Sequence, residues 1–311
     1  MPKFKNEALR DSIVPTELLE VLGWPEAPSE IWQEPFDEVR GHCERIADTT
    51  KPTDLIEFCD FFLDYQYMTV QEDFLSFAFP KALEAWARHE LGLPARERFN
   101  GEWDFEGMWD ALACRPIHPE FFDAAQFNAL AGFFVRVLLA RLQQETVLSF
   151  RGGHPRSFEW MYLLATLIWQ FPVAEHIWKQ WWRLETPQMA ICAVQWLSVF
   201  IYDHDDNPYF DPWTEEEHGG PPQVFETLHI RAKAAPPTNV DFMCAILTKK
   251  NVEAVLFRAV EVLSDHENAK QVYETWLDLS RRSAVFERRV KKFTTLMRRD
   301  KQEFVTYWSD I

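Results

Sequence analysis

Apolar residues recur at intervals of three or four along most of the chain, which is the spacing that places them on one face of an α-helix. The longest such pattern covers 119–146 and is apolar around much of its circumference, so we expect this helix to lie centrally. Shorter patterns predict helices at 16–22, 29–47 with a break near residue 34, 53–65, 70–79, 80–91, 157–171, 173–184, 187–202, 239–248, 251–263, 267–279 and 283–299.

Local signals mark several helix ends. Thr186 followed by Pro187 is typical of an N-cap and a first helical position, and Gly23 suits the residue that follows a helix. Pro80 also suits a first helical turn. The patterns on its two sides therefore predict either two helices or one kinked helix.

Short connections, of roughly two to five residues, join the predicted helices of the second half and make consecutive helices antiparallel neighbours. We predict an all-α fold of stacked antiparallel helical hairpins, either an α-α superhelix or a HEAT-like bundle. No fixed repeat period is visible. We expect residues 1–311 to form a single domain with an N-terminal lobe over 1–100, a packed connection at 92–118 and a C-terminal helical lobe over 119–311.

The range 203–238 interrupts the helical pattern with six prolines, which predicts one long irregular insertion. Its first part is acidic and aromatic, and contains no Lys or Arg up to residue 217. Crowded carboxylates speed association with a cationic partner, and aromatic residues among them act as anchors. We therefore predict a binding surface made of Asp203, Asp205, Asp206, Tyr209, Phe210, Asp211, Trp213, Glu215, Glu216 and Glu217. The alternative is a solvated acidic loop.

The composition narrows the class of partner. Only 10 of the 311 residues are glycine, which argues against a fold rich in tight turns. The formal net charge of −17 opposes binding to nucleic acid or to an anionic membrane, and it favours a basic protein or a cation. A role of this charge in solubility alone is the alternative.

Two metal-site patterns occur around the acidic segment. Asp203, Asp205 and Asn207 have the spacing that begins an EF-hand calcium loop, but Pro208 and Thr214 occupy the positions of its glycine and its glutamate. Oxygen ligands of this kind suit Ca²⁺ or Mg²⁺. The departures from the pattern favour a loop without a bound metal.

The second pattern is the dipeptide His204-Asp205, with His176 upstream on a predicted helix. It resembles the HD-domain metal phosphohydrolases, which are all-helical enzymes. The resemblance implies that His176, His204 and Asp205 would bind the metal, with Asp241 or Asp265 as a fourth ligand. The glycine-containing turn that commonly follows the family's His-Asp pair is absent here. A helix-flanking His176 and an exposed His204 are the alternative.

Other catalytic motifs are absent from the sequence, so no enzyme and no cofactor are indicated. The five cysteines are widely spaced and form no C-x-x-C pair, which favours reduced thiols. No secretory signal is visible at the N-terminus, and Arg136 interrupts one of the two most apolar stretches, both of which are far shorter than the ~20 residues of a membrane span. We therefore expect a cytoplasmic protein.

The segment 281–301 has nine basic and two acidic residues in a chain that is otherwise strongly acidic. Phe286, Val290, Phe293 and Met297 share one face of the predicted helix. Such a helix can bind nucleic acid, acidic lipid or a partner groove. We favour docking on the protein's own acidic body.

Six tryptophans lie close together on three predicted helices, at positions 160, 169, 178, 181, 182 and 196. We interpret most of them as core residues. Trp181 and Trp182 are adjacent, and because adjacent residues of a helix point in different directions, the two side chains cannot easily face the same core. Together these features favour a non-enzymatic, acidic helical scaffold that binds a protein partner, preferably a basic one. Small bacterial immunity and antitoxin proteins have this general character. The alternative is the HD-type metal phosphohydrolase.

Overall fold

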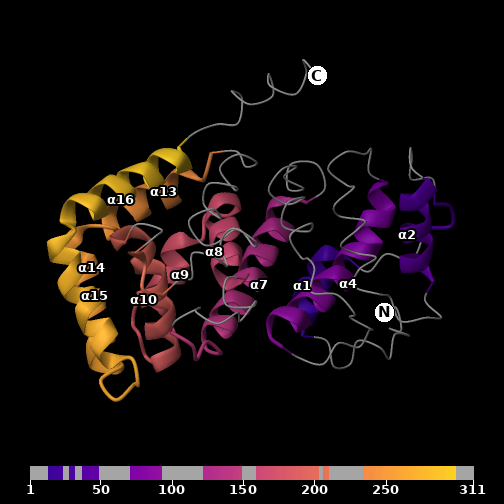
Figure 1. The fold of residues 1–311 in the computed structure, drawn as a ribbon. Coiled ribbons are helices and arrows are strands. Elements are labelled where there is room, and N and C mark those ends of the chain that lie inside the picture. The colour runs from indigo at the N-terminus through magenta and orange to yellow at the C-terminus, as the bar shows by residue number, and fades with distance from the viewer. Residues whose placement is uncertain are drawn as a thin grey trace. The chain divides into compact units, whose positions relative to one another are not determined.

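The structure is a computed structural model, and it describes residues 13–23, 28–31, 37–48, 71–92, 122–148, 159–202, 206–209 and 234–298. Within these ranges 75% of the residues are helical and no strand occurs. The predicted all-α class is therefore confirmed (Figure 1). The chain divides into two compact units, residues 1–137 and 138–311, and this division falls inside a helix. The predicted lobes over 1–100 and 119–311 stay a prediction, and residues 93–118 of the predicted connection lie outside the described residues.

The first unit contains α1 (Thr16–Leu22), α2 (Asp37–Ala47), α4 (Glu72–Glu90) and most of α7 (Ala124–Leu142). Of the two possibilities predicted around Pro80, the structure has one continuous helix, α4, with Pro80 inside it. The proline removes one backbone hydrogen bond. Side chains on both sides of Pro80, including Phe74 and Trp86, are buried, and the helix packs against α1 and α2.

The side chain of Trp86 forms the centre of the aromatic core of this unit. Its ring contacts the rings of Phe133 and Phe134 on α7 edge-on, at centroid distances of 6.2 and 5.3 Å. Among the described helices, α7 alone is long and apolar enough to cross a membrane. Half of this stretch is buried, including Phe133 and Phe134, whose rings contact Trp86.

The second unit contains the end of α7 and seven further helices: α8 (Glu159–Gln170), α9 (Ala174–Trp181), α10 (Pro187–Ile201), α13 (Pro237–Ile246), α14 (Lys249–Val262), α15 (Ala269–Arg281) and α16 (Ser283–Met297). Helix α10 is buried at every position from Met189 to Ile201. It packs against α14, α15 and α16, while α14 and α15 lie side by side (Figure 1). The core of this unit therefore surrounds α10.

Two predicted helix ends are confirmed. The Thr186 side chain accepts a hydrogen bond from the backbone N–H of Met189, and Pro187 is the first residue of α10. Gly23 follows α1 with a φ of 78°, a left-handed conformation that residues with a side chain rarely adopt. In both places, local chemistry alone determined where the helix begins or ends.

The tryptophans of α8, α9 and α10 are core residues, as predicted. Trp160, Trp181 and Trp196 have no exposed surface, and the rings of Trp181 and Trp196 lie 5.9 Å apart. Trp182 is half-buried and also contacts Trp196, at 6.3 Å. The pair Trp181-Trp182 thus meets one cluster because α9 ends at Trp181, and Trp182 is already outside the regular helix.

Candidate functional site

The predicted binding surface in the acidic segment lies largely outside the described residues. Asp203, Asp205, Phe210, Asp211, Trp213, Glu215, Glu216 and Glu217 all do, so their part of the prediction stays open. Asp206 and Tyr209 are described. Asp206 is exposed, as a binding surface requires, and it also forms an ion pair with Arg282.

Tyr209 lies in the core and not on the surface that the sequence predicted. Its side chain has no exposed surface, and its hydroxyl is hydrogen-bonded to the hydroxyl of Thr275 on α15. A side chain in this position is a core residue and offers no contact to a partner. The reason is that an aromatic ring with one polar end is stable inside a protein once that end has a partner.

The turn 206–209 is held on the body by further hydrogen bonds. The Asn207 amide donates to the Ser198 hydroxyl at 3.1 Å, and the Gln271 amide donates to the carbonyl of Pro208 at 3.0 Å. The start of the acidic segment is therefore fixed to α10 and α15.

Burial changes the acidity of the two tyrosines in this region. Tyr202 donates to the carboxylate of Asp278 at 3.0 Å, and burial is the main cause that raises its pKa. Burial raises the pKa of Tyr209 as well. Both phenols therefore stay protonated, and they serve as hydrogen-bond donors or acceptors rather than as bases.

The metal site implied by His176, His204 and Asp205 is not assembled in the part of the chain that the structure describes. His176 is exposed on α9, and its Nε2 atom lies 2.9 Å from the side-chain amide nitrogen of Gln180. His204 and Asp205 lie outside the described residues. Within the described ranges, no group of three His, Cys, Asp or Glu side chains is close enough to hold a metal ion.

Helix α16 docks on its own unit through its apolar face. Phe286, Phe293 and Met297 are buried there, and the guanidinium group of Arg289 donates to the carbonyl of Val199 on α10 at 2.7 Å. This outcome agrees with the favoured interpretation of the basic segment. Apolar burial contributes to this docking, and Arg282 at the start of the segment also forms an ion pair with Asp206.

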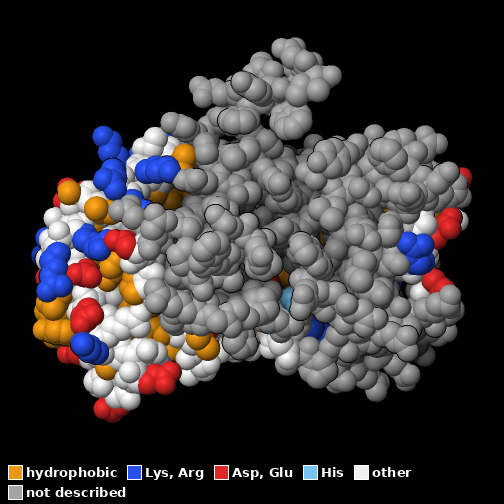
Figure 2. Space-filling model, viewed as in Figure 1, with side chains coloured by type: hydrophobic (Ala, Val, Ile, Leu, Met, Phe, Trp, Pro, Cys, Tyr) orange, Lys and Arg blue, Asp and Glu red, His pale blue; other side chains and the backbone are white. Residues whose placement is uncertain are grey.

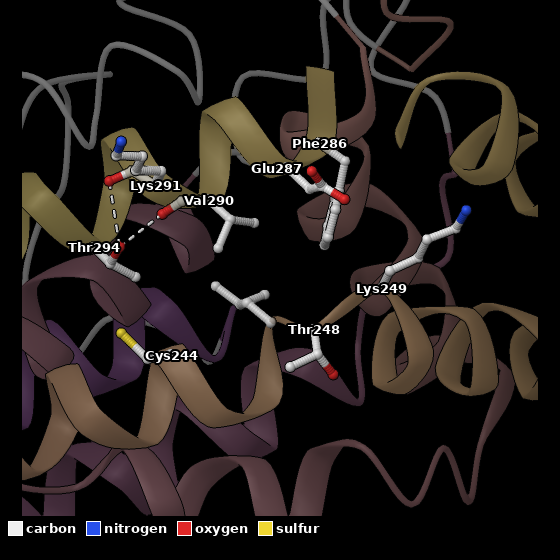
Figure 3. Close-up of a pocket in the computed structure, with 9 residues that line it drawn as sticks. Cys244, Thr248, Lys249, Phe286, Glu287, Val290, Lys291 and Thr294 are labelled. Carbon is white, nitrogen blue, oxygen red and sulfur yellow. Dashed lines mark hydrogen bonds between the residues drawn. The ribbon is translucent and has the colours of Figure 1, made fainter. Parts of the chain in front are cut away.

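The outward side of α16 is basic. Residues 281–298 contain seven basic residues against Glu287, and Figure 2 shows Lys and Arg side chains gathered over the region where Figure 1 places α13 and α16. A pocket of about 300 Å³ lies between α16 and the junction of α13 with α14 (Figure 3). Leu247, Phe286 and Val290 form its apolar surface.

Polar groups around the pocket fall into two kinds. The hydroxyl of Thr294 donates to the carbonyl of Val290 at 2.9 Å, and that of Thr248 accepts from the backbone N–H of Asn251, so both are used within their own helices. The charged side chains Lys249, Lys291 and Glu287 stand at the rim. The pocket therefore combines an apolar interior with a rim of net positive charge.

An exposed aromatic cluster lies on the α14–α15 hairpin. Phe257 and Tyr273 are 48% and 46% exposed, and each ring lies 5.6 Å from the ring of Trp276. The only other large hydrophobic side chain exposed to this degree in the described ranges is Val21. Figure 2 shows hydrophobic side chains at the surface over these two helices.

Sequence reasoning missed both the pocket and the aromatic cluster. A signal for the cluster exists: Val252, Leu256 and Ala259 form the buried stripe of α14, and Phe257 falls outside this stripe. Tyr273 likewise follows the buried Val272 by one residue. The pocket has no such signal, because its two sides are about 40 residues apart in the sequence.

A comparison with known protein families found no matching family, and comparisons with curated proteins and with solved structures found no similar protein.

Proposed function

We propose that the protein is a non-enzymatic interaction scaffold, and that its aromatic cluster on α14 and α15 contacts a protein partner. The observation that carries the proposal is the exposure of Phe257 and Tyr273, at 48% and 46%, beside Trp276. Large apolar side chains gathered at one place on a surface are typical of interaction sites, whereas isolated ones are common everywhere. Aromatic residues also dominate the binding energy of protein interfaces.

The charge around the cluster favours a basic partner. Residues 253–278 contain two basic residues, Arg258 and Lys270, and six acidic ones, a net charge of −4. Arg258 pairs with Glu261 and Lys270 with Glu274, so the basic groups are already neutralised. Carboxylates in excess around an aromatic contact would speed the approach of a cationic surface, and the aromatic rings would slow its release.

The acidic segment 203–217 belongs to the same proposal. Of its residues, Asp206 lies on the exposed side of a turn that is anchored to α15, which also carries Tyr273 and Trp276. We infer that the remaining acidic and aromatic residues of this segment add to the attraction of a basic partner. The scaffold would then be built of stacked helical hairpins and would act, like immunity proteins in general, by covering a cationic site.

A photo-crosslinking experiment in extracts of the native host tests the proposal. A photoreactive phenylalanine analogue at position 257 should crosslink to one protein of high isoelectric point. The double substitution of Phe257 and Tyr273 by Ser should abolish the co-purification of that protein. Both side chains are about half-exposed, so the melting temperature should change little.

Val21→Ser is the matched control, since Val21 is 40% exposed in the first unit and lies in no aromatic cluster. It should leave the co-purification intact. The proposal fails if the analogue at position 257 yields no specific product, or if the Phe257 and Tyr273 double variant retains the partner at wild-type level.

A further inference from the structure

The pocket between α13, α14 and α16 has the features of a binding site for part of a larger ligand. It measures about 300 Å³, and its interior is formed by Leu247 and Phe286, which are buried, and by Val290, which is half-buried. This volume is near the lower limit for small-molecule sites. The pocket can take up one apolar side chain, so its ligand must be held by further contacts outside it.

Those further contacts are charged. Lys291 comes from α16 and Lys249 from the first turn of α14, on opposite sides of the pocket in Figure 3. Neither lysine has a carboxylate partner among the described residues. The guanidinium group of Arg298 lies at one end, where it donates to the sulfur of Cys244 at 3.3 Å. Among the described residues that line the pocket, Glu287 is the one acidic group, so their net charge is positive.

From this charge complementarity, we propose that the pocket and its basic rim bind an acidic peptide segment of a partner protein, which inserts one apolar or aromatic side chain between Leu247, Phe286 and Val290. The carboxylates on both sides of that side chain pair with Lys249 and Lys291. This surface is separate from the acidic, aromatic surface of α14 and α15, and the inference does not depend on the function proposed for that surface.

Nucleic acid is the rival ligand for a basic surface, and the observations favour it less. The pocket presents an apolar interior, which phosphates do not use. The whole chain also carries a net charge of −17, which opposes a long polyanion more strongly than a short peptide.

Fluorescence anisotropy with three labelled ligands tests the inference on the full-length protein. The first is a short peptide of Glu and Asp with one central Phe, and the second has Ser in place of that Phe. The third is a single-stranded DNA oligonucleotide of equal charge. The Phe peptide should bind about tenfold more tightly than the Ser peptide, because the ring becomes buried. Added salt should weaken both peptides to the same degree.

Two charge-matched double variants locate the site. Lys249→Glu with Lys291→Glu should weaken the Phe peptide at least tenfold. Lys250→Glu with Lys292→Glu changes the net charge equally at neighbouring exposed positions that do not line the pocket, and it should have a much smaller effect. Circular dichroism checks that both variants are folded.

Cys244 gives a readout that needs no substitution. Its side chain lines the pocket and is exposed, so saturating Phe peptide should slow its alkylation, measured by mass spectrometry. The inference is overturned if alkylation is unaffected, if both double variants lose binding equally, or if the Ser peptide binds as tightly as the Phe peptide. Tighter binding of the DNA than of the Phe peptide would also overturn it, in favour of nucleic acid.

Discussion

Arg282 donates a hydrogen bond to the carboxylate of Asp206, 76 residues earlier in the chain, and thereby fixes the start of the acidic segment to the end of α15. The guanidinium group of Arg282 also lies over the ring of Tyr202, 4.9 Å from its centroid. The ion pair raises the pKa of Arg282, which keeps its positive charge at any physiological pH. The charge of Asp206 is therefore compensated by a basic residue that is distant in the sequence.

Tyr209 should matter more for stability than this ion pair. The side chains of Asp206 and Arg282 are 44% and 32% exposed, and pairs at the surface contribute about 1 kcal/mol or less. Tyr209 is fully buried, and Tyr209→Ala would leave a cavity and the Thr275 hydroxyl without this partner. We expect a loss of about 3–5 kcal/mol for Tyr209→Ala, and of at most about 1 kcal/mol for Asp206→Ala. Urea denaturation measures both, and equal losses would contradict the assignment of Tyr209 to the core.

A buried asparagine and an exposed one should differ strongly in their contribution to stability. The side chain of Asn239 on α13 donates to the carbonyls of Ile168 and Phe171, at 2.7 and 2.6 Å, and accepts from the N–H of Ala174 at 3.1 Å. Asn239→Ala would leave three buried backbone groups without this partner, at a cost of about 1–3 kcal/mol for each group that stays unpaired.

Asn251→Ala is the matched control for Asn239→Ala. The side-chain amide of Asn251 makes a hydrogen bond to the carbonyl of Ala245, but this residue is exposed and water can replace the bond. Its loss should change the melting temperature by only a degree or two. Asn239→Ala should lower it by several degrees or more, at about 2–4 °C per kcal/mol for a unit of this size. Scanning calorimetry distinguishes the two outcomes.

Whether the sequence predicts a feature of this structure depends on how far apart in the chain the interacting residues lie. The N-cap at Thr186 and the helix end at Gly23 depend on neighbours within a few residues, so both were predicted correctly. The same holds for the periodic apolar stripe of α16. The sequence favours docking of this stripe on the protein's own body but leaves a partner groove open.

Contacts between residues distant in the sequence are the features that the sequence does not predict. The sequence predicts Tyr209 as a surface residue because its neighbours in the sequence are polar and include proline. The hydroxyl to which Tyr209 is hydrogen-bonded belongs to Thr275, 66 residues away. Similarly, Lys249 and Lys291 join at one pocket only because α14 and α16 pack together. The position of these two lysines at one pocket depends on tertiary packing, so no local pattern of residue types predicts it.

The cysteines should differ in reactivity. Burial raises the pKa of the Cys43 thiol to about 12 and that of Cys192 well above its usual range, whereas Cys244 is exposed. Since the thiolate is the reactive form, iodoacetamide at pH 8 should modify Cys244 in the native protein and leave Cys43 and Cys192 unmodified until urea unfolds the chain. Peptide mass mapping measures each position separately. Rapid native labelling of Cys192 would show that α10 opens easily, against its complete burial.

Alkaline pH should destabilise the protein because of its buried thiol and phenol groups. An unfolded chain loses thiol protons near pH 8.5 and tyrosine protons near pH 10, whereas the folded state retains those of Cys43, Cys192, Tyr202 and Tyr209 because burial raises their pKa values. Above these pH values the unfolded state binds fewer protons than the folded state. The free energy of unfolding must then fall with rising pH, by about 1.4 kcal/mol per pH unit for each such group.

Tyr202→Phe isolates one of these groups. The substitution removes the phenol that is hydrogen-bonded to Asp278, so it should lower the free energy of unfolding at pH 8 by about 1 kcal/mol. Above pH 10, the free energy of unfolding should fall less steeply than in the wild type, by about 1.4 kcal/mol per pH unit. The wild type gives the reference slope. Urea denaturation between pH 8 and pH 11 measures both slopes. If Tyr202→Phe and the wild type decline in parallel above pH 10, the phenol of Tyr202 ionises as readily in the folded protein as in the unfolded chain, and the buried network of Tyr202, Tyr209 and Thr275 does not hold its proton.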